Sequence, residues 1–267
     1  LMGYDEAPGS GSDKSGSHNL VVGIHHNYSS VGSLVVGQEN TVSGTYSSVS
    51  AGRENIASGF HASVSGGSQN TASDFDASVS GGRDNTANGV AASVTGGFQN
   101  SASGLISSVS GGQENEASAD FSSASGGFRN TASGSRSSVS GGFQNVASGG
   151  ISSISGGQNS TAIAAHSSIS GGTNNTASGS NSTISGGQDN IASGLNSSIS
   201  GGRNNEASDD YASVAGGFQN KSSGRYTNIS GGRNNEASEL FSTVSGGSSR
   251  SVTGIDDWRA GTLFETN

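Results

Sequence analysis

The chain of 267 residues has little of what usually builds a globular core. Only 29% of its residues are hydrophobic and 6% are aromatic, whereas a typical globular domain is about 45–50% apolar when glycine is counted. By composition alone, such a chain is typical of a flexible linker rich in glycine and serine. The strict sequence period described below argues against disorder, because an entropic linker does not require one.

Cysteine is absent and proline occurs once. The absence of cysteine excludes a disulfide framework and a thiolate metal site. The scarcity of proline excludes a polyproline or collagen-like rod and suits long hydrogen-bonded ladders. No apolar run approaches the roughly 18 residues of a transmembrane helix, and the opening residues LMGYDEAPG lack the basic and apolar regions of a signal peptide. We therefore expect the chain to be a piece of a longer polypeptide.

The charge balance narrows the class of partner. The formal net charge is −9 and the isoelectric point lies near 4.8. Nucleic acid and anionic membrane surfaces carry charge of the same sign, so both are disfavoured as partners.

What the sequence does contain is a 15-residue repeat built on the motif SVSGG. Its aliphatic position never slips, and it predicts a buried core ladder in which Ala124 takes one place and the other members are Val49, Val64, Val79, Val94, Val109, Val139, Ile154, Ile169, Ile184, Ile199, Val214, Ile229 and Val244. An asparagine recurs six residues later, except at Ser160 and Arg250. It predicts a second ladder, whose amides bond to neighbouring coils, at Asn55, Asn70, Asn85, Asn100, Asn115, Asn130, Asn145, Asn175, Asn190, Asn205, Asn220 and Asn235.

A fixed short period is the signature of a solenoid, in which each coil buries its apolar positions against its neighbours. Fifteen residues suit a coil of two short strands and two turns, with parallel strands stacked about 4.8 Å apart. The stretches NLVVG and SLVVG are predicted to be the same strand in a more apolar form, with Leu34 one 15-residue step before Val49. The predicted fold is an all-β parallel β-solenoid, or β-roll, of about sixteen coils.

The two strands of a coil differ in the faces they bury. Asn55 and Ala57 recur along the chain while the residue between them varies, so that strand has one solvated face. The SVSGG strand is nearly invariant on both faces, which predicts burial on both sides. Because one chain has so little apolar area, we expect the outer partner to be another copy of the chain.

The outward serines of this strand are the candidates for the subunit interface: Ser50, Ser65, Ser80, Ser110, Ser140, Ser170 and Ser200. The two glycines that follow mark a corner of the coil, and the second one is expected to take a positive φ.

The NLVVG strand at residues 19–23, the SVSGG strands and the intervening NxASG turns resemble the head domain of trimeric autotransporter adhesins, the YadA-head type with Hep/Hag-type repeats. This resemblance covers residues 19 to about 254. It implies a left-handed parallel β-roll and a homotrimer on the bacterial cell surface or outside the cell, where such heads bind host or matrix proteins or glycans. Two departures are that most coils have 15 rather than 14 residues and that glycine replaces the family's second aliphatic residue.

The chain is predicted to divide into a lead-in at residues 1–18, the repeat domain at residues 19–254 and a C-terminal cap at residues 255–267. A solenoid needs a cap because its last coil exposes core and strand edges. The cap is assigned to Trp258, Leu263 and Phe264. The ending SVTGIDDWRAGTLFETN is similar to the close of uncharacterised bacterial surface proteins with the same repeats.

Candidate chemical sites are few, and we expect no cofactor, no metal and no catalysis. The run HHNY lacks cysteine or acidic ligands at a useful spacing. The motifs GGRDN and GGQDN lack the nonapeptide period of calcium repeats, and no serine nucleophile elbow has histidine and aspartate partners. Two other classes stay open: an ice-binding solenoid, which needs a flat outward threonine array, and a polysaccharide-active β-helix, which needs a compact charged cluster in a groove.

Three irregular columns run along the corners of the coils. The first column contains Arg53, Arg83, Phe98, Phe128, Phe143, Arg203, Phe218 and Arg233, the adjoining one contains Glu54, Asp84, Glu114 and Asp189, and the third contains Tyr46, Phe121, Tyr211, Tyr226 and Phe241. Each column is either a tolerant solvated surface or a contact surface for a glycan or a protein. The predicted function is a non-catalytic structural or adhesive head or spacer that binds such ligands through a repetitive trimeric surface.

Overall fold

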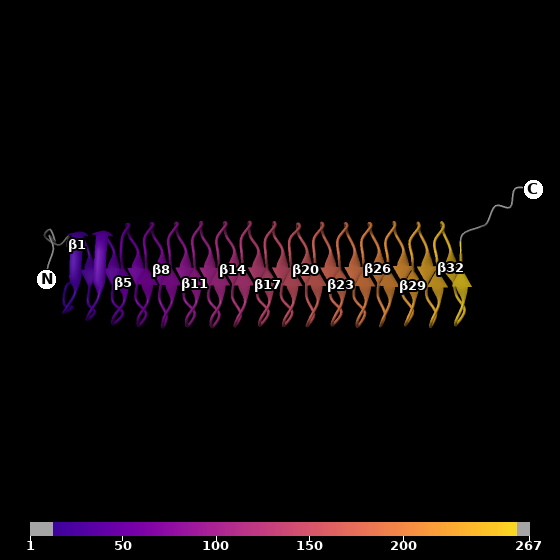
Figure 1. Ribbon diagram of the computed structural model, residues 1–267, viewed down its shortest axis with the longest axis horizontal. Coiled ribbons are helices and arrows are strands. Elements are labelled where there is room, and N and C mark those ends of the chain that lie inside the picture. The colour runs from indigo at the N-terminus through magenta and orange to yellow at the C-terminus, as the bar shows by residue number, and fades with distance from the viewer. Residues whose placement is uncertain (1–12, 261–267) are drawn as a thin grey trace, which may run out of the picture. The chain divides into compact units, whose positions relative to one another are not determined.

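The computed structural model describes residues 13–260, which form an all-β parallel β-solenoid of about sixteen turns without a helix in that range. Contacts group the chain into two units, Leu1–Arg136 and Ser137–Asn267. In each unit the strands form two sheets, and successive strands of a sheet come from successive coils, as the side-by-side arrows in Figure 1 show.

In the first unit, odd-numbered strands build one sheet and even-numbered strands the other. The first sheet holds β1 (Leu20–Ile24), β3 (Leu34–Gln38), β5 (Ser48–Val49), β7 (Ser63–Val64), β9 (Ser78–Val79), β11 (Ser93–Val94), β13 (Ser108–Val109) and β15 (Ser123–Ala124). The second sheet holds β2 (Asn27–Tyr28), β4 (Thr41–Val42), β6 (Ile56–Ala57), β8 (Thr71–Ala72), β10 (Thr86–Ala87), β12 (Ser101–Ala102), β14 (Glu116–Ala117) and β16 (Thr131–Ala132).

The second unit repeats this plan. Its first sheet holds β17 (Ser138–Val139), β19 (Ser153–Ile154), β21 (Ser168–Ile169), β23 (Thr183–Ile184), β25 (Ser198–Ile199), β27 (Ser213–Val214), β29 (Asn228–Ile229), β31 (Thr243–Val244) and β33 (Trp258–Arg259). Its second sheet holds β18 (Val146–Ala147), β20 (Thr161–Ala162), β22 (Thr176–Ala177), β24 (Ile191–Ala192), β26 (Glu206–Ala207), β28 (Lys221–Ser222), β30 (Glu236–Ala237) and β32 (Ser251–Val252).

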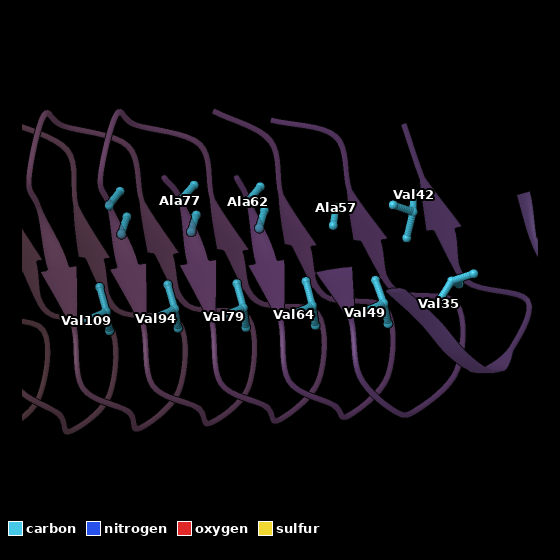
Figure 2. Packing of buried hydrophobic residues seen from close by; sticks show 14 of the residues in the cluster. Val35, Val42, Val49, Ala57, Ala62, Val64, Ala77, Val79, Val94 and Val109 are labelled. Carbon is cyan, nitrogen blue, oxygen red and sulfur yellow. The ribbon is translucent and has the colours of Figure 1, made fainter. Parts of the chain in front are cut away.

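The buried hydrophobic core of the coils consists mainly of valine, isoleucine and alanine. In the first unit, Val49, Val64 and Val79 form a row that faces Ala62 and Ala77 across the interior (Figure 2). Every residue predicted for the core ladder is buried, and so is Ala124. The second sheet has one buried and one outward face: Ala57 is buried whereas Ile56 is 38% exposed.

The alignment of the first coils corrects the prediction that Leu34 precedes Val49 by one repeat. Val35 pairs with Val49 and Leu34 pairs with Ser48, so this step is 14 residues. The inward position of the LVVG strand belongs to its first valine, and the leucine lies on the outer face, where Leu20 is 45% exposed.

The fifteenth residue of the later coils can also be placed. Gln38 bridges to Arg53, and a side chain added at Gly37 would meet the Gly52 carbonyl. The later coil therefore has one more residue than the preceding coil between Val49 and Arg53. Asn55 Nδ2 donates to the Ala51 carbonyl as Asn40 Nδ2 does to the Val36 carbonyl, so Ala51 takes the place of Val36 in this hydrogen bond.

Both predicted boundaries of the repeat domain lie inside the stack. The Gly16 amide donates to the Tyr28 carbonyl at 2.9 Å, and Ser17 bridges to Val31. At the other end, Trp258 pairs with Thr243 in the first sheet. The predicted lead-in residues 1–12 and the cap residues Leu263 and Phe264 lie outside the described residues.

Candidate functional site

The outward face of the first sheet is made of small hydroxyl side chains. The predicted interface serines Ser50, Ser65, Ser80 and Ser110 in the first unit are exposed, as are Ser140, Ser170 and Ser200 in the second. At the start of the first unit the same face is apolar, because Leu20 and Val22 are 45% and 43% exposed. This face is therefore flat, repetitive and uncovered within a single chain.

The glycines beside this face have two different environments. Gly187 has a φ of +88°, and a Cβ there would lie 2.2 Å from the Gly202 carbonyl oxygen, which confirms the predicted positive φ of the second glycine. A Cβ on Gly186 would meet no atom within 4 Å, and Ala51 occupies the equivalent place in an earlier coil.

Most coils share the surroundings of Gly186, and at Gly66 an added Cβ would meet only the Ala51 Cβ, at 3.7 Å. Gly231 and Gly246 are equally open but differ in their backbone, with φ values of +150° and +143°. In most coils, then, no contact inside the chain requires glycine at the first position of the pair.

The asparagine ladder is a continuous interior hydrogen-bond network in each unit, and all its predicted members are buried. The backbone N–H of Asn85 donates to Asn70 Oδ1 at 3.0 Å. Asn70 Nδ2 donates to the carbonyls of Gly66 and Gly82 at 3.1 and 2.9 Å. Each asparagine therefore ties its own corner to the next coil, and its amide has partners for both its oxygen and its nitrogen.

Two members of this ladder were not predicted. Asn40 is buried, and its backbone N–H donates to Nδ1 of the equally buried His26 at 3.2 Å. His26 Nε2 lies 3.2 Å from the Val22 carbonyl oxygen. The imidazole thus takes the place of an asparagine amide, because its two nitrogens can accept and donate in the same way. The neighbouring His25 points outward and lies 3.8 Å from Glu39.

The arginine and phenylalanine column of the first unit is charge-compensated. Arg53 lies 3.3 Å from Glu54, and Arg83 lies 3.5 Å from Asp84. Arg129 pairs with Glu114 of the preceding coil. The hydrogen bonds from Arg129 and from Gln113 hold the pKa of Glu114 below its usual value.

Cation–π contacts complete this column. The Arg83 guanidinium carbon lies 4.3 Å from the centre of the Phe98 ring, and that of Arg129 lies 4.7 Å from the centre of the Phe128 ring. In the second unit, Arg203 and Arg233 lie 4.7 and 5.6 Å from the centre of the Phe218 ring between them. These contacts keep the long cationic side chains along the corner.

The other corner carries stacked aromatic rings. In the first unit, the Phe60 and Phe75 rings lie 5.2 Å apart, with Tyr46 at the edge of Phe60. In the second unit, Tyr226 stacks on Tyr211 at 4.7 Å and on Phe241 at 5.1 Å. Phe121, predicted for the same column, is 45% exposed and lies near Arg136. Because the rings cover one another's faces, the surface offers mainly their edges.

The described part of the C-terminal segment continues the stack. Trp258 is 63% exposed, and its indole N–H donates to Ser245 Oγ at 2.7 Å. β33, which contains Trp258, is therefore an additional strand of the first sheet, and the Trp258 side chain points outward.

No protein-family model matches the chain, and no curated protein matches it. Between residues 13 and 260, histidine, aspartate and glutamate nowhere form a group of three or more that could hold a metal ion. No helix in the same range is long and apolar enough to cross a membrane.

Proposed function

We propose that this chain is a non-catalytic structural or adhesive head or spacer, a left-handed β-roll that assembles as a homotrimer at a bacterial cell surface and binds host or matrix proteins or glycans. The proposal joins the resemblance of its repeats to the heads of trimeric autotransporter adhesins with the outward face of the first sheet. The observation that supports it most is the open environment of the first glycine in most coils, exemplified by Gly186.

Small residues at an exposed position usually vary, because neither packing nor backbone geometry restricts them. Here exposed serines recur along one face, and a Cβ added to the first glycine of most pairs would meet no atom of the chain within 4 Å. Close approach of a second backbone explains this restriction, since small side chains allow two sheets to come together while their hydroxyls bond to one another. Burial of Leu20 and Val22 at one end of the face would add to the stability of the assembly.

The assembly can be tested with one variant on each sheet of the same coil. Ser170→Arg adds a long charged side chain to the proposed interface, whereas Thr176→Arg adds it to the outward face of the second sheet. Light scattering of the wild type should give three times the chain mass of 26.1 kDa. We expect Ser170→Arg to lower the mass and Thr176→Arg to preserve it. A folded wild-type monomer, or equal behaviour of the two variants, would contradict the proposal.

The adhesive role is tested by binding to immobilised matrix proteins and glycans. Three linked copies raise avidity without any new contact, so the trimer should bind at least one surface more tightly than Ser170→Arg does. If the wild-type trimer binds none of these proteins or glycans, the adhesive role is overturned, whereas the structural role is still supported by the assembly.

A further inference from the structure

One place in the second unit combines positive charge, an aromatic ring and a hollow in the surface. Arg203, Phe218 and Arg233 occupy the same corner position in three successive coils, and backbone bridges join each to the next. The three side chains line a depression of about 410 Å³. The phenyl ring lies between the two guanidinium groups, at 4.7 and 5.6 Å from their carbons.

The two arginines differ from those of the first unit in their neighbours. In the first unit, Arg53 and Arg83 are each followed by an acidic residue that pairs with the guanidinium group. In the second unit, the residues after the arginines are Asn204 and Asn234. Across residues 13–260, neither Arg203 nor Arg233 has an ion pair. Each guanidinium group carries five N–H donors, which are free to bind a ligand.

Neutral amides and a few carboxylates surround these groups. The exposed amides of Asn204, Gln219 and Asn234 lie in the adjoining column, and such amides can bond to hydroxyl groups. Two glutamates stand three residues beyond the arginines, and one of them, Glu206, pairs with Lys221 at 3.7 Å. Asp189 follows Gln188, which bridges to Arg203, and its carboxylate accepts a hydrogen bond from Asn174 Nδ2 at 3.0 Å.

We propose that Arg203, Phe218 and Arg233 form a binding site for an acidic glycan, through its carboxylate or sulfate groups. This rests on the proposed adhesive role and gives it a ligand class. Phe218 holds the two guanidinium groups apart and restricts their motion, so less side-chain entropy is lost on binding. Guanidinium groups bind planar or tetrahedral oxyanions by paired hydrogen bonds.

The spacing of the two arginines favours a polysaccharide over other polyanions. They are two coils apart, which is about 9.6 Å for parallel strands stacked at 4.8 Å. Acidic groups on alternate sugars of a linear glycan recur over the length of two sugar rings, a comparable span. Same-face side chains of an extended peptide recur at about 6.8 Å. Single-stranded nucleic acid needs an open aromatic face for base stacking, and here the guanidinium groups cover the ring.

The test uses the full chain and labelled oligosaccharides, measured by fluorescence anisotropy. Polygalacturonate fragments supply carboxylates, heparin fragments supply sulfates, and dextran is the neutral control. We expect wild type to bind at least one acidic probe and not dextran, with affinity falling as salt rises. Arg203→Gln combined with Arg233→Gln should lower affinity about tenfold or more, and Phe218→Leu should lower it less. Arg53→Gln, at a compensated arginine, should stay within about twofold.

The site is overturned if the double variant binds as tightly as wild type, or if no acidic probe binds. Tighter binding of poly-glutamate or of single-stranded DNA than of either glycan overturns the ligand class. Light scattering of the same samples separates this result from the trimer proposal. Loss of glycan binding with an intact trimer in the double variant supports the site, whereas a monomeric wild type that still binds glycan contradicts only the assembly.

Discussion

Gly186 and Gly187 are neighbours in the sequence but differ in what surrounds them. Gly187 has a left-handed backbone and lies against the next coil, whereas Gly186 faces open space. One glycine is therefore required by the path of a single chain. The other is restricted, on the proposal above, by an approaching partner.

This contrast gives a prediction at the residue scale. Gly187→Ala should lower the free energy of unfolding by about 3 kcal/mol or more, because the methyl group meets a carbonyl and φ is positive. Gly186→Ala should change it by about 0.5 kcal/mol or less, since alanine already stands at Ala51. Urea unfolding followed by circular dichroism measures both. Equal losses for the two variants would show that the second glycine is not specially constrained.

Single residues also show what could be predicted from the sequence. The asparagine ladder was predictable because an amide that recurs at one position of every coil can bond to its own copies. The role of His26 was not predictable, because a single histidine does not form a repeating pattern. Its ring nevertheless makes the equivalent hydrogen bonds, to the Val22 carbonyl and to the backbone N–H of Asn40. The corner column of arginines and phenylalanines was visible in the sequence, but the sandwich around Phe218 depends on side-chain conformations that no repeat pattern specifies.

Most strands in each unit are only two residues long, too short to be stable separately. In the second unit, β23 and β24 lie in the same coil but in different sheets, and each contributes one isoleucine. Ile184 is buried between neighbours of the core ladder, whereas Ile191 faces outward and is 45% exposed. Each strand thus owes its stability to the coils before and after it.

At this scale we predict unequal costs for the same substitution. Ile184→Ala should lower the free energy of unfolding by about 2–5 kcal/mol, and Ile184→Val by about 0.5–1.5 kcal/mol. Ile191→Ala should cost about 1 kcal/mol or less because much of its side chain stays in water. The shift of the urea midpoint is the measurement. An Ile191→Ala loss as large as that of Ile184→Ala would contradict the assignment of faces.

Which residues of a strand face inward could be predicted where apolar and polar residues alternate clearly. The prediction was wrong where they do not. In the later coils, a single aliphatic residue between two serines identifies the inward position. The LVVG strands contain three aliphatic residues in a row, so both faces are apolar and periodicity cannot distinguish them. The register of Leu34 was wrong for this reason, and the backbone pairing of Val35 with Val49 corrects it.

For the whole molecule, the repeating register matters more than any one contact. Within each unit a residue of a regular coil pairs with the residue fifteen positions later, as Ser168 does with Thr183. The ladders therefore do not depend on the order of the coils, provided that the spacing between equivalent residues stays at 15.

The corresponding prediction compares two deletions. Removing residues 176–190, one whole coil, brings Asn175 next to Ile191 and leaves every ladder in register. Removing residues 176–183, about half a coil, places inward residues at outward positions in the coils that follow. The first variant should keep a cooperative thermal transition close to that of wild type, measured by circular dichroism. The second should lose it, and a cooperative transition there would contradict the importance of register.

The same register has a genetic consequence. Recombination between equivalent positions of two 15-residue coils adds or removes a whole number of coils, so the product keeps every ladder in register. Lineages can lengthen, shorten or reshuffle the array in a single event, without passing through unstable intermediates. The side chains at the corners are encoded in the same coils. The three coils that carry Arg203, Phe218 and Arg233 can therefore be duplicated or lost together, while the ladders of the core stay the same.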